Sequence, residues 1–249
     1  MGWRGHFSRP AVLNVERKRY ESFETETLHI AALLSGDDHL LDPEFCTEWG
    51  VRRQSVRVDN PRLLGFAART LFANARNDYD LFVFAEDDLM PRDGALLRKI
   101  AGFTEAFGPR RLAMPNRYEW NPRGPGLKTY NDGDLRPGLI GPRIDAIPDE
   151  EWLRQPFGSS SIVFHRALNP HSGFYALTRD QLLYWIEQDH FSDIDCSFVS
   201  PLESAATLGV LKTFSIYKPH GPDVGWIEIE HLDDRYSSLP FPRVEAGAP

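Results

Sequence analysis

Cysteine is scarce in this sequence. Only Cys46 and Cys196 occur among 249 residues, and neither belongs to a Cys-x-x-Cys pair. Domains held together by disulfides, and structural zinc sites, need more cysteines at closer spacing. Both are therefore excluded on composition, and we expect a protein of a reducing compartment, the cytoplasm.

Long apolar runs and an excess of positive charge are also missing. No stretch approaches the roughly 18 apolar residues of a membrane span, and the first residues lack the apolar core of a signal peptide. We expect no transmembrane segment and, at most, peripheral contact with a membrane. The net charge of −8 argues against nucleic acid as a partner, because nucleic-acid binding needs a basic face.

The most informative stretch runs from residue 81 to residue 88. An apolar, aromatic run, Leu-Phe-Val-Phe-Ala, is followed at once by the three carboxylates Glu86, Asp87 and Asp88. Such a run is typical of a strand buried on both faces, and ligands of open α/β sheets bind beyond the carboxyl ends of the strands. Because three like charges repel, a bound divalent cation would make them tolerable. The pattern predicts a cation platform.

A simpler interpretation of the acidic triplet exists. Acidic residues often lie in solvated loops, and Asp88 could precede a helix over 93–100, where an acid interacts favourably with the helix dipole. Direct termination of a buried strand favours the functional interpretation.

Strands and a helix alternate in the first hundred residues. We predict strands at 11–15, 28–34 and 55–58, a helix from Pro61 to Asn77, and the strand that ends at Glu86. A strand, helix and strand in succession form the unit of a parallel sheet. We therefore predict an α/β fold in which residues 1–249 form a single Rossmann-like domain, with a mixed, mostly parallel central sheet flanked by helices. Asp37 and Asp38 end the second strand, either as a plain turn or as contacts to a ligand's base or ribose.

The pattern changes after residue 114. Proline and glycine interrupt residues 115–160, which predicts a long loop or lid. Order returns with strands at 161–165 and 172–177, a helix capped by Thr178 or Asp180, and a helix from 201 that ends at Gly209. Further strands are expected at 213–217 and 226–231. Residues 1–114 are then a nucleotide-binding half, residues 115–242 an acceptor-side half, and residues 243–249 a disordered tail.

Two stretches carry a resemblance to a known family. Asn60-Pro-Arg-Leu-Leu-Gly65, with Arg69 on the same helix and Tyr79 to Asp88 after it, resembles the GT-A-fold glycosyltransferases. In these enzymes a Gly- and Arg-bearing helix precedes a hydrophobic strand that ends in a DxD-type motif, here Glu-Asp-Asp. The likeness spans about residues 50–100, and a weaker likeness runs from 172 to 209. It implies transfer of a hexose or N-acetylhexosamine from a nucleotide-diphosphate sugar, a UDP-sugar, to a hydroxyl acceptor, with Mn²⁺ or Mg²⁺.

The resemblance also implies roles for individual residues. Asp88 would be a direct metal ligand, and Glu86 and Asp87 would contact the metal or the sugar-nucleotide. Further contacts to the nucleotide-sugar would come from Asp38, Arg62 and Arg69. The chemistry is consistent, because a hard cation held by carboxylates neutralises the charge that develops on a departing diphosphate.

A third protein ligand to the metal in this family is often a C-terminal histidine. His231, at the end of the alternating stretch 226–231, is the first candidate, and His220 is the second. The alternative is that either histidine is structural or merely exposed.

An acidic residue would act as the base that takes the proton of the acceptor hydroxyl. Glu203 is the first candidate, because it lies in the first turn of the helix that begins at Pro201. Asp193 and Asp195 are rivals. The alternative for Glu203 is a first-turn acid that only stabilises the helix dipole.

Two other functions remain open. A nucleotidyltransferase would share the nucleotide-binding sheet, but the Gly-rich basic loop that such enzymes use for a triphosphate is not visible. A catalytically inactive sugar- or nucleotide-binding domain is the other. The aromatic residues of the middle region either stack on sugar rings or pin their loop to the core; they are Tyr118, Trp120, Tyr130 and Trp152.

Overall fold

The computed structural model describes residues 11–22, 27–36, 39–121, 128–144 and 146–240. Helices and strands both occur throughout this part of the chain, so the fold is a mixed one of α and β elements, as expected. In chain order the elements are β1 (Ala11–Asn14), β2 (Arg19–Ser22), β3 (Ile30–Ser35), α2 (Pro43–Trp49), β4 (Val51–Val56), η1 (Pro61–Phe66), α3 (Ala67–Asn74), β5 (Leu81–Ala85), β6 (Leu89–Met90), α4 (Leu96–Phe107), β7 (Arg111–Ala113), β8 (Asn116–Trp120), β9 (Lys128–Tyr130), α5 (Pro137–Ile144), β10 (Trp152–Phe157), β11 (Ser160–Arg166), β12 (Phe174–Thr178), α6 (Arg179–Ile186), α7 (Pro201–Leu211), β13 (Ser215–Pro219), η2 (Gly221–Asp223) and β14 (Glu228–His231).

The strands form several small sheets rather than one mostly parallel sheet. The larger ones have the orders β10-β11-β13-β7 and β6-β14-β8-β9. Among the described strands, β3–β4, β13–β7 and β14–β8 pair in parallel, and the other pairings are antiparallel. The expected mostly parallel sheet is therefore not confirmed. Local patterns identify strands, but they do not reveal that the partner of β5 is β12, which runs in the opposite direction.

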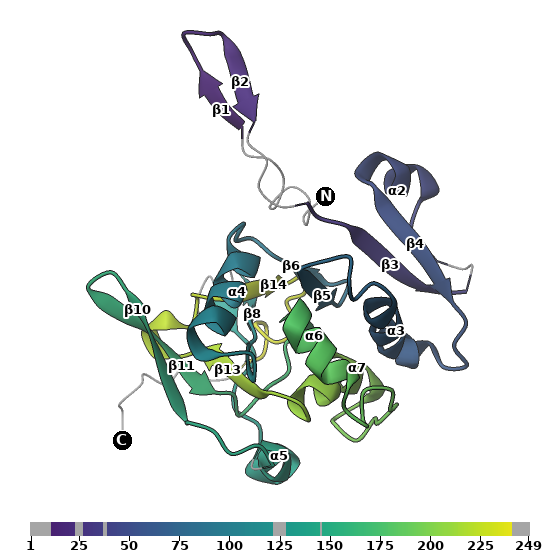
Figure 1. Ribbon diagram of the computed structural model, residues 1–249, viewed down its shortest axis with the longest axis vertical. Coiled ribbons are helices and arrows are strands. Elements are labelled where there is room, and N and C mark those ends of the chain that lie inside the picture. The colour runs from purple at the N-terminus through teal and green to yellow at the C-terminus, as the bar shows by residue number, and fades with distance from the viewer. Residues whose placement is uncertain (1–10, 23–26, 37–38, 122–127, 145, 241–249) are drawn as a thin grey trace.

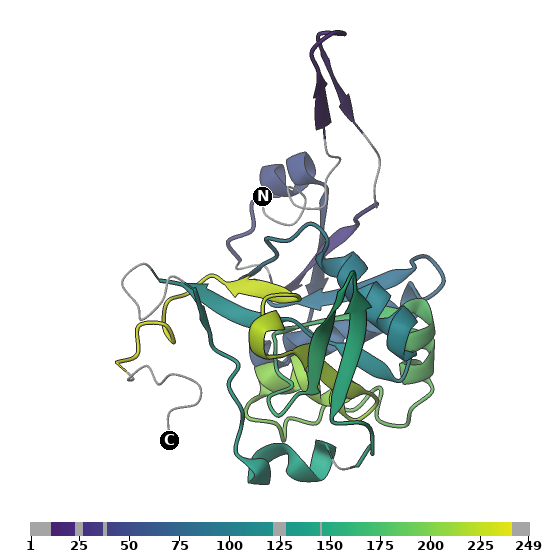
Figure 2. The ribbon, with the colours of Figure 1, turned by 90° about the vertical axis from the view of Figure 1, so that its left-hand side faces the viewer.

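The two halves expected at 1–114 and 115–242 share their sheets. Strands β5, β6 and β7 pair with β12, β14 and β13 respectively. In Figures 1 and 2 the hairpin of β1 and β2 projects away from the body that these sheets form.

The region expected to be a long loop, 115–160, contains regular structure. Strands β8, β9 and β10 and helix α5 lie in it, so the loop prediction is wrong for most of the described residues there. Arg117 and Glu119 on β8 are charged but buried, so this short strand lacks the apolar buried face by which a strand is usually recognised. The predicted tail, 243–249, lies outside the described residues.

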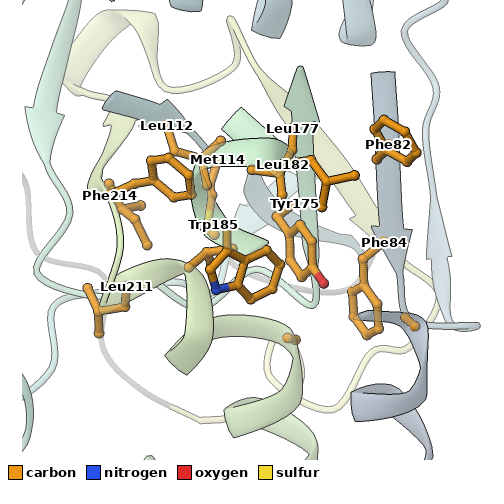
Figure 3. Close-up of a cluster of buried hydrophobic side chains, with 14 of the residues drawn as sticks. Phe82, Phe84, Leu112, Met114, Tyr175, Leu177, Leu182, Trp185, Leu211 and Phe214 are labelled. Carbon is orange, nitrogen blue, oxygen red and sulfur yellow. The ribbon is translucent and has the colours of Figure 1, made fainter. Parts of the chain in front are cut away.

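An aromatic core holds β5 in place. Phe84 on β5 stacks on its cross-strand partner Tyr175 with ring centroids 5.1 Å apart, and Tyr175 meets Trp185 of α6 edge-on at 5.8 Å. Figure 3 shows these three rings side by side among the buried apolar residues. Each such pair contributes about 0.5–1.5 kcal/mol beyond the burial of its area. The position at which β5 ends is therefore fixed from one face by large, rigid side chains.

Close packing explains the Gly and Arg of the stretch that resembles the glycosyltransferases. A Cβ at Gly65 would lie 2.9 Å from the Cβ of Ala205 on α7, and a Cβ at Gly209 would lie 2.7 Å from Nη2 of Arg69. Gly209 lies inside α7 and does not end it, so that prediction is wrong. These glycines let η1 and α3 approach α7 closely.

Arg69 belongs to this packing and not to a ligand site. Its side chain is buried, it donates to the carbonyls of Phe191 and Asp193 at 3.1 and 2.8 Å, and its guanidinium lies over the rings of Phe66 and Trp185. The expectation that Arg69 contacts a nucleotide-sugar is therefore corrected. No helix among the described residues is both long and apolar enough to cross a membrane.

Candidate functional site

The three carboxylates follow β5 directly, as predicted. Strand β5 ends at Ala85, and the backbone N–H of Glu86 donates to the carbonyl of Gly173 at 2.9 Å. Gly173 has φ +59°, and a Cβ there would lie 2.3 Å from Oε2 of Glu86. Only glycine combines this left-handed conformation with so close an approach. The Glu86 side chain therefore lies directly against the backbone of Gly173, the residue that precedes β12.

His231 lies next to Asp88, although the two are far apart in the sequence. Strand β14 pairs with β6 so that His231 stands opposite Leu89, and the N–H of Leu232 donates to the carbonyl of Asp88 at 2.8 Å. As a result Nε2 of His231 lies 3.3 Å from Oδ2 of Asp88. The structure thus brings together the two residues that the sequence assigned to a metal.

A buried carboxylate holds the other side of the His231 ring. Nδ1 of His231 lies 2.9 Å from Oε1 of Glu119, whose side chain is fully buried. Glu119 also accepts hydrogen bonds from the Asn131 side chain at 3.2 Å and from the backbone N–H groups of Tyr236 and Ser237 at 2.9 and 2.6 Å. With so many donors around it, Glu119 acts as an acceptor, and a neutral His231 then carries its proton on Nδ1.

This tautomer turns the lone pair of Nε2 toward Asp88. Two electron-pair donors 3.3 Å apart are arranged like neighbouring ligands of an octahedral cation, which at bond lengths of about 2.1 Å lie about 3 Å from each other. A histidine that binds metal through one nitrogen and a carboxylate through the other is a recurrent arrangement in metal sites. A protonated His231 would instead form an ion pair with both carboxylates.

Glu86 is the electrostatically strained member of the triplet. Burial, followed by the charges of Asp88, Glu203 and Asp87, raises its pKa to about 7, while the charge of Arg117 lowers it. Glu203, in the first turn of α7, is therefore close enough to Glu86 for its charge to act on this carboxyl. Glu203 accepts a hydrogen bond from the hydroxyl of Ser200, which caps this helix.

Arg117 is held in place by a buried ion pair. Its Nη2 lies 2.9 Å from Oδ1 of Asp132, and Nζ of Lys218 lies 2.8 Å from Oδ2 of the same carboxylate. Burial alone would raise the pKa of Asp132, but Lys218 and Arg117 outweigh burial and keep this pKa below its ordinary value. The positively charged side chains of Arg117 and Lys218 share the single negative charge of Asp132, so a net positive charge remains near Glu86.

Sequence reasoning missed Glu119, Arg117 and Asp132. They lie in the region taken for a loop, and their pairing partners are more than ten residues away along the chain. The one available signal was the alternation Arg117-Tyr118-Glu119, which places two charged residues on the same face of a short strand.

Asp195 and Asp193 belong to a different cluster. Nζ of Lys212 lies 2.7 Å from Asp195 and 2.6 Å from Asp193. Its hydrogen bond to Asp195 holds the pKa of that carboxyl below the ordinary range. Lys212 is the C-terminal cap of α7, whereas Glu203 lies in the first turn. The catalytic role of Asp195 stays a prediction, and Glu203 is the candidate whose charge acts on Glu86.

The remaining predicted residues fall into three situations. His220, the second choice as metal ligand, lies in a cluster of rings with Trp152 and His165. Arg62 is exposed on η1, and its role stays a prediction. Asp38 lies outside the described residues.

Within the described part of the chain no group of three or more His, Cys, Asp or Glu side chains is placed to hold a metal ion. Asp88 and His231 form a pair and not a group of this size.

Comparisons with protein-family models, with curated proteins and with solved structures gave no match to this chain. Its function must be inferred from the chemistry of the site itself.

Proposed function

We propose that this protein is a metal-dependent glycosyltransferase with a single GT-A-like domain, which transfers a sugar from a nucleotide-diphosphate sugar, a UDP-sugar, to a hydroxyl acceptor. The observation that carries the proposal is the pair of Asp88 and His231 beyond the end of β5, with the buried Glu119 behind the histidine. The resemblance of residues 50–100 to GT-A enzymes supports it.

The donor set fits Mn²⁺ or Mg²⁺. Asp88 offers a carboxylate oxygen and His231 an imidazole nitrogen, and Glu119 orients the ring. Cations of this kind keep much of their shell for water and for phosphate oxygens, so two protein ligands are sufficient. When bound, the cation supplies neutralisation of the charge that develops on the leaving diphosphate.

The neighbouring residues have roles that follow from their charge. Glu86, whose pKa lies at about 7, is about half protonated at neutral pH, and its protonated form can donate a hydrogen bond to a sugar or phosphate oxygen. Arg117, held by Asp132, adds positive charge near Glu86. Glu203, at the first turn of α7, accepts the proton of the acceptor hydroxyl.

The first test measures binding of nucleotides. UDP, GDP, CMP and dTDP are titrated into the wild-type protein by calorimetry, with and without Mn²⁺. We expect Mn²⁺-dependent binding of one of them, and a loss of at least tenfold in affinity in Asp88→Asn and in His231→Ala. The matched control is Asp80→Asn, because Asp80 lies just before β5, at the end opposite Asp88, with a fully exposed side chain. Unchanged affinity in Asp88→Asn would remove this site from the proposal.

The second test separates binding from transfer. Glu203→Gln should bind the nucleotide with wild-type affinity and lose sugar transfer. Near-normal turnover of this variant would refute the role of Glu203. A wild-type protein that binds a nucleotide-sugar with Mn²⁺ but neither transfers nor slowly hydrolyses it would be a binding domain.

A further inference from the structure

A cluster of three rings lies on the outer part of the sheet β10-β11-β13-β7. The ring centroid of Trp152 is 4.2 Å from that of His165 and 5.2 Å from that of His220, and the two histidine rings are 5.2 Å apart. Trp152 nevertheless keeps 44% of its surface exposed. We call Trp152, His165 and His220 the ring platform.

The platform is rigid although it is open to solvent. Trp152 lies on the edge strand β10 and directly opposes His165, which in turn directly opposes Lys218 on β13. Residues that oppose each other across a strand pair project to the same face of the sheet. The neighbours fix one side of the tryptophan ring, while part of the ring remains uncovered. An indole held in this way loses little entropy when a ligand stacks on it.

A hollow adjoins the platform. Its volume is about 230 Å³, and its lining includes Asp149, Glu151, His165 and Arg166. This is smaller than the roughly 300–1,000 Å³ of pockets for drug-sized ligands, so it suits a single small ring. His165 belongs to both features, so the hollow borders the platform at this residue.

The polar groups around the hollow carry both signs of charge. Asp149 is already paired with Arg111 at 2.9 Å, and Arg166 donates to the carbonyls of Ile144 and Ile147. Glu151 has an exposed side chain and lies 3.3 Å from Nε2 of His165. The balance of charge favours a neutral ligand with many hydroxyl groups over an ion.

We propose that the ring platform and its hollow bind a neutral sugar ring of the acceptor, so that the acceptor of the transferase is a saccharide. The apolar face of the sugar stacks on the exposed part of Trp152, and Glu151 and His165 bond to its hydroxyls. The assignment as acceptor rests on the proposed function. It is supported by the row Trp152–His165–Lys218, since Lys218 pairs with Asp132, the partner of Arg117 in the candidate site.

The experiment measures saccharide binding without nucleotide or metal. The labelled protein, residues 1–249, is applied to an array of neutral mono- and oligosaccharides, and the best binder is then titrated in solution. We expect at least one neutral saccharide to bind, with a loss of tenfold or more in Trp152→Ala and a smaller loss in Glu151→Gln. The matched control is Trp120→Ala, because Trp120 is 53% exposed at the end of β8 and has no part in the platform.

Three results would overturn the inference. They are the absence of any neutral saccharide that binds, an equal loss of binding in Trp120→Ala and Trp152→Ala, and binding of tetramethylammonium, a cationic probe, at Trp152 in place of sugar. Mn²⁺-dependent nucleotide binding should be unchanged in Trp152→Ala. If nucleotide binds but no saccharide does, only the platform fails. If saccharide binds and nucleotide does not, the transferase proposal fails and the sugar site stands.

Discussion

The most direct test of the site's electrostatics is the replacement of Glu86 by glutamine. Burial and the charge of Asp88 raise the pKa of Glu86 from 4.5 to about 7. The folded protein therefore binds a proton between pH 4.5 and pH 7 that the unfolded chain has already released. By linkage, the wild-type protein loses stability as the pH rises through this interval, and the loss is complete above pH 7.

The size of the effect follows from the same two values. Each unit of pKa difference between the folded and unfolded states corresponds to 1.36 kcal/mol, so the pH-dependent loss of stability has an upper limit of about 3 kcal/mol. Partial exposure of Glu86 reduces it to about 2 kcal/mol. Glu86→Gln keeps the shape of the side chain and removes the charge. The free energy of unfolding of the variant, relative to that of the wild type, should therefore rise by about 2 kcal/mol between pH 4 and pH 8.

Urea unfolding at several pH values, followed by circular dichroism, measures this difference. Titrating groups that do not interact with Glu86 contribute equally to both proteins and cancel. His171 is one of them, because burial lowers its pKa to about 3 and its contribution is lost as the pH falls below 6.5. Glu105→Gln, which changes an exposed carboxyl on α4, serves as the control and should show no such trend.

Parallel stability curves for Glu86→Gln and the wild type, within about 0.5 kcal/mol at every pH, would refute the reasoning. They would mean that Glu86 is solvated in the folded protein. The seat that Gly173 forms for Glu86 would then have no electrostatic consequence.

Three further predictions concern residues around the site. Gly173→Ala should destabilise the protein by about 2 kcal/mol, since alanine is strained at this φ and its Cβ would meet Glu86; urea unfolding measures the loss, and wild-type stability would contradict it. Glu119→Gln places an amide N–H among hydrogen-bond donors, so it should lower the free energy of unfolding by about 1–3 kcal/mol and weaken Mn²⁺-dependent nucleotide binding about 10- to 100-fold. Calorimetry checks the affinity, and an unchanged value would show that Glu119 does not support metal binding through His231. Arg69→Met should lower the free energy of unfolding by about 3 kcal/mol and leave nucleotide affinity unchanged, whereas a selective loss of affinity would restore Arg69 to the ligand site.

The sequence alone was sufficient to predict those strands and helices whose pattern is local. The apolar run before Glu86 predicted β5, and Thr178 predicted the start of α6, where the structure shows its side chain accepting from the N–H of Gln181. A strand buried by aromatic residues and a capped helix leave a signature within a few neighbouring positions.

Pairing over long distances could not be predicted in the same way. The partner of β5 is β12, and Glu119 meets His231 across more than a hundred residues. His231 was nevertheless placed next to Asp88 by the resemblance, not by any periodicity. Gly65 and Gly209 also could not be explained from the sequence, because glycine is required there by residues distant in the chain: Ala205 and Arg69 leave no room for a Cβ.

The order of the strands has a consequence for synthesis on the ribosome. Strands β13 and β14, among the last elements of the chain, occupy interior places between β11 and β7 and between β6 and β8. Until they leave the exit tunnel, the strands on either side present unpaired edges, which are prone to join with other chains. A nascent polypeptide released before β13 and β14 are synthesised would therefore be prone to aggregate and would lack His231.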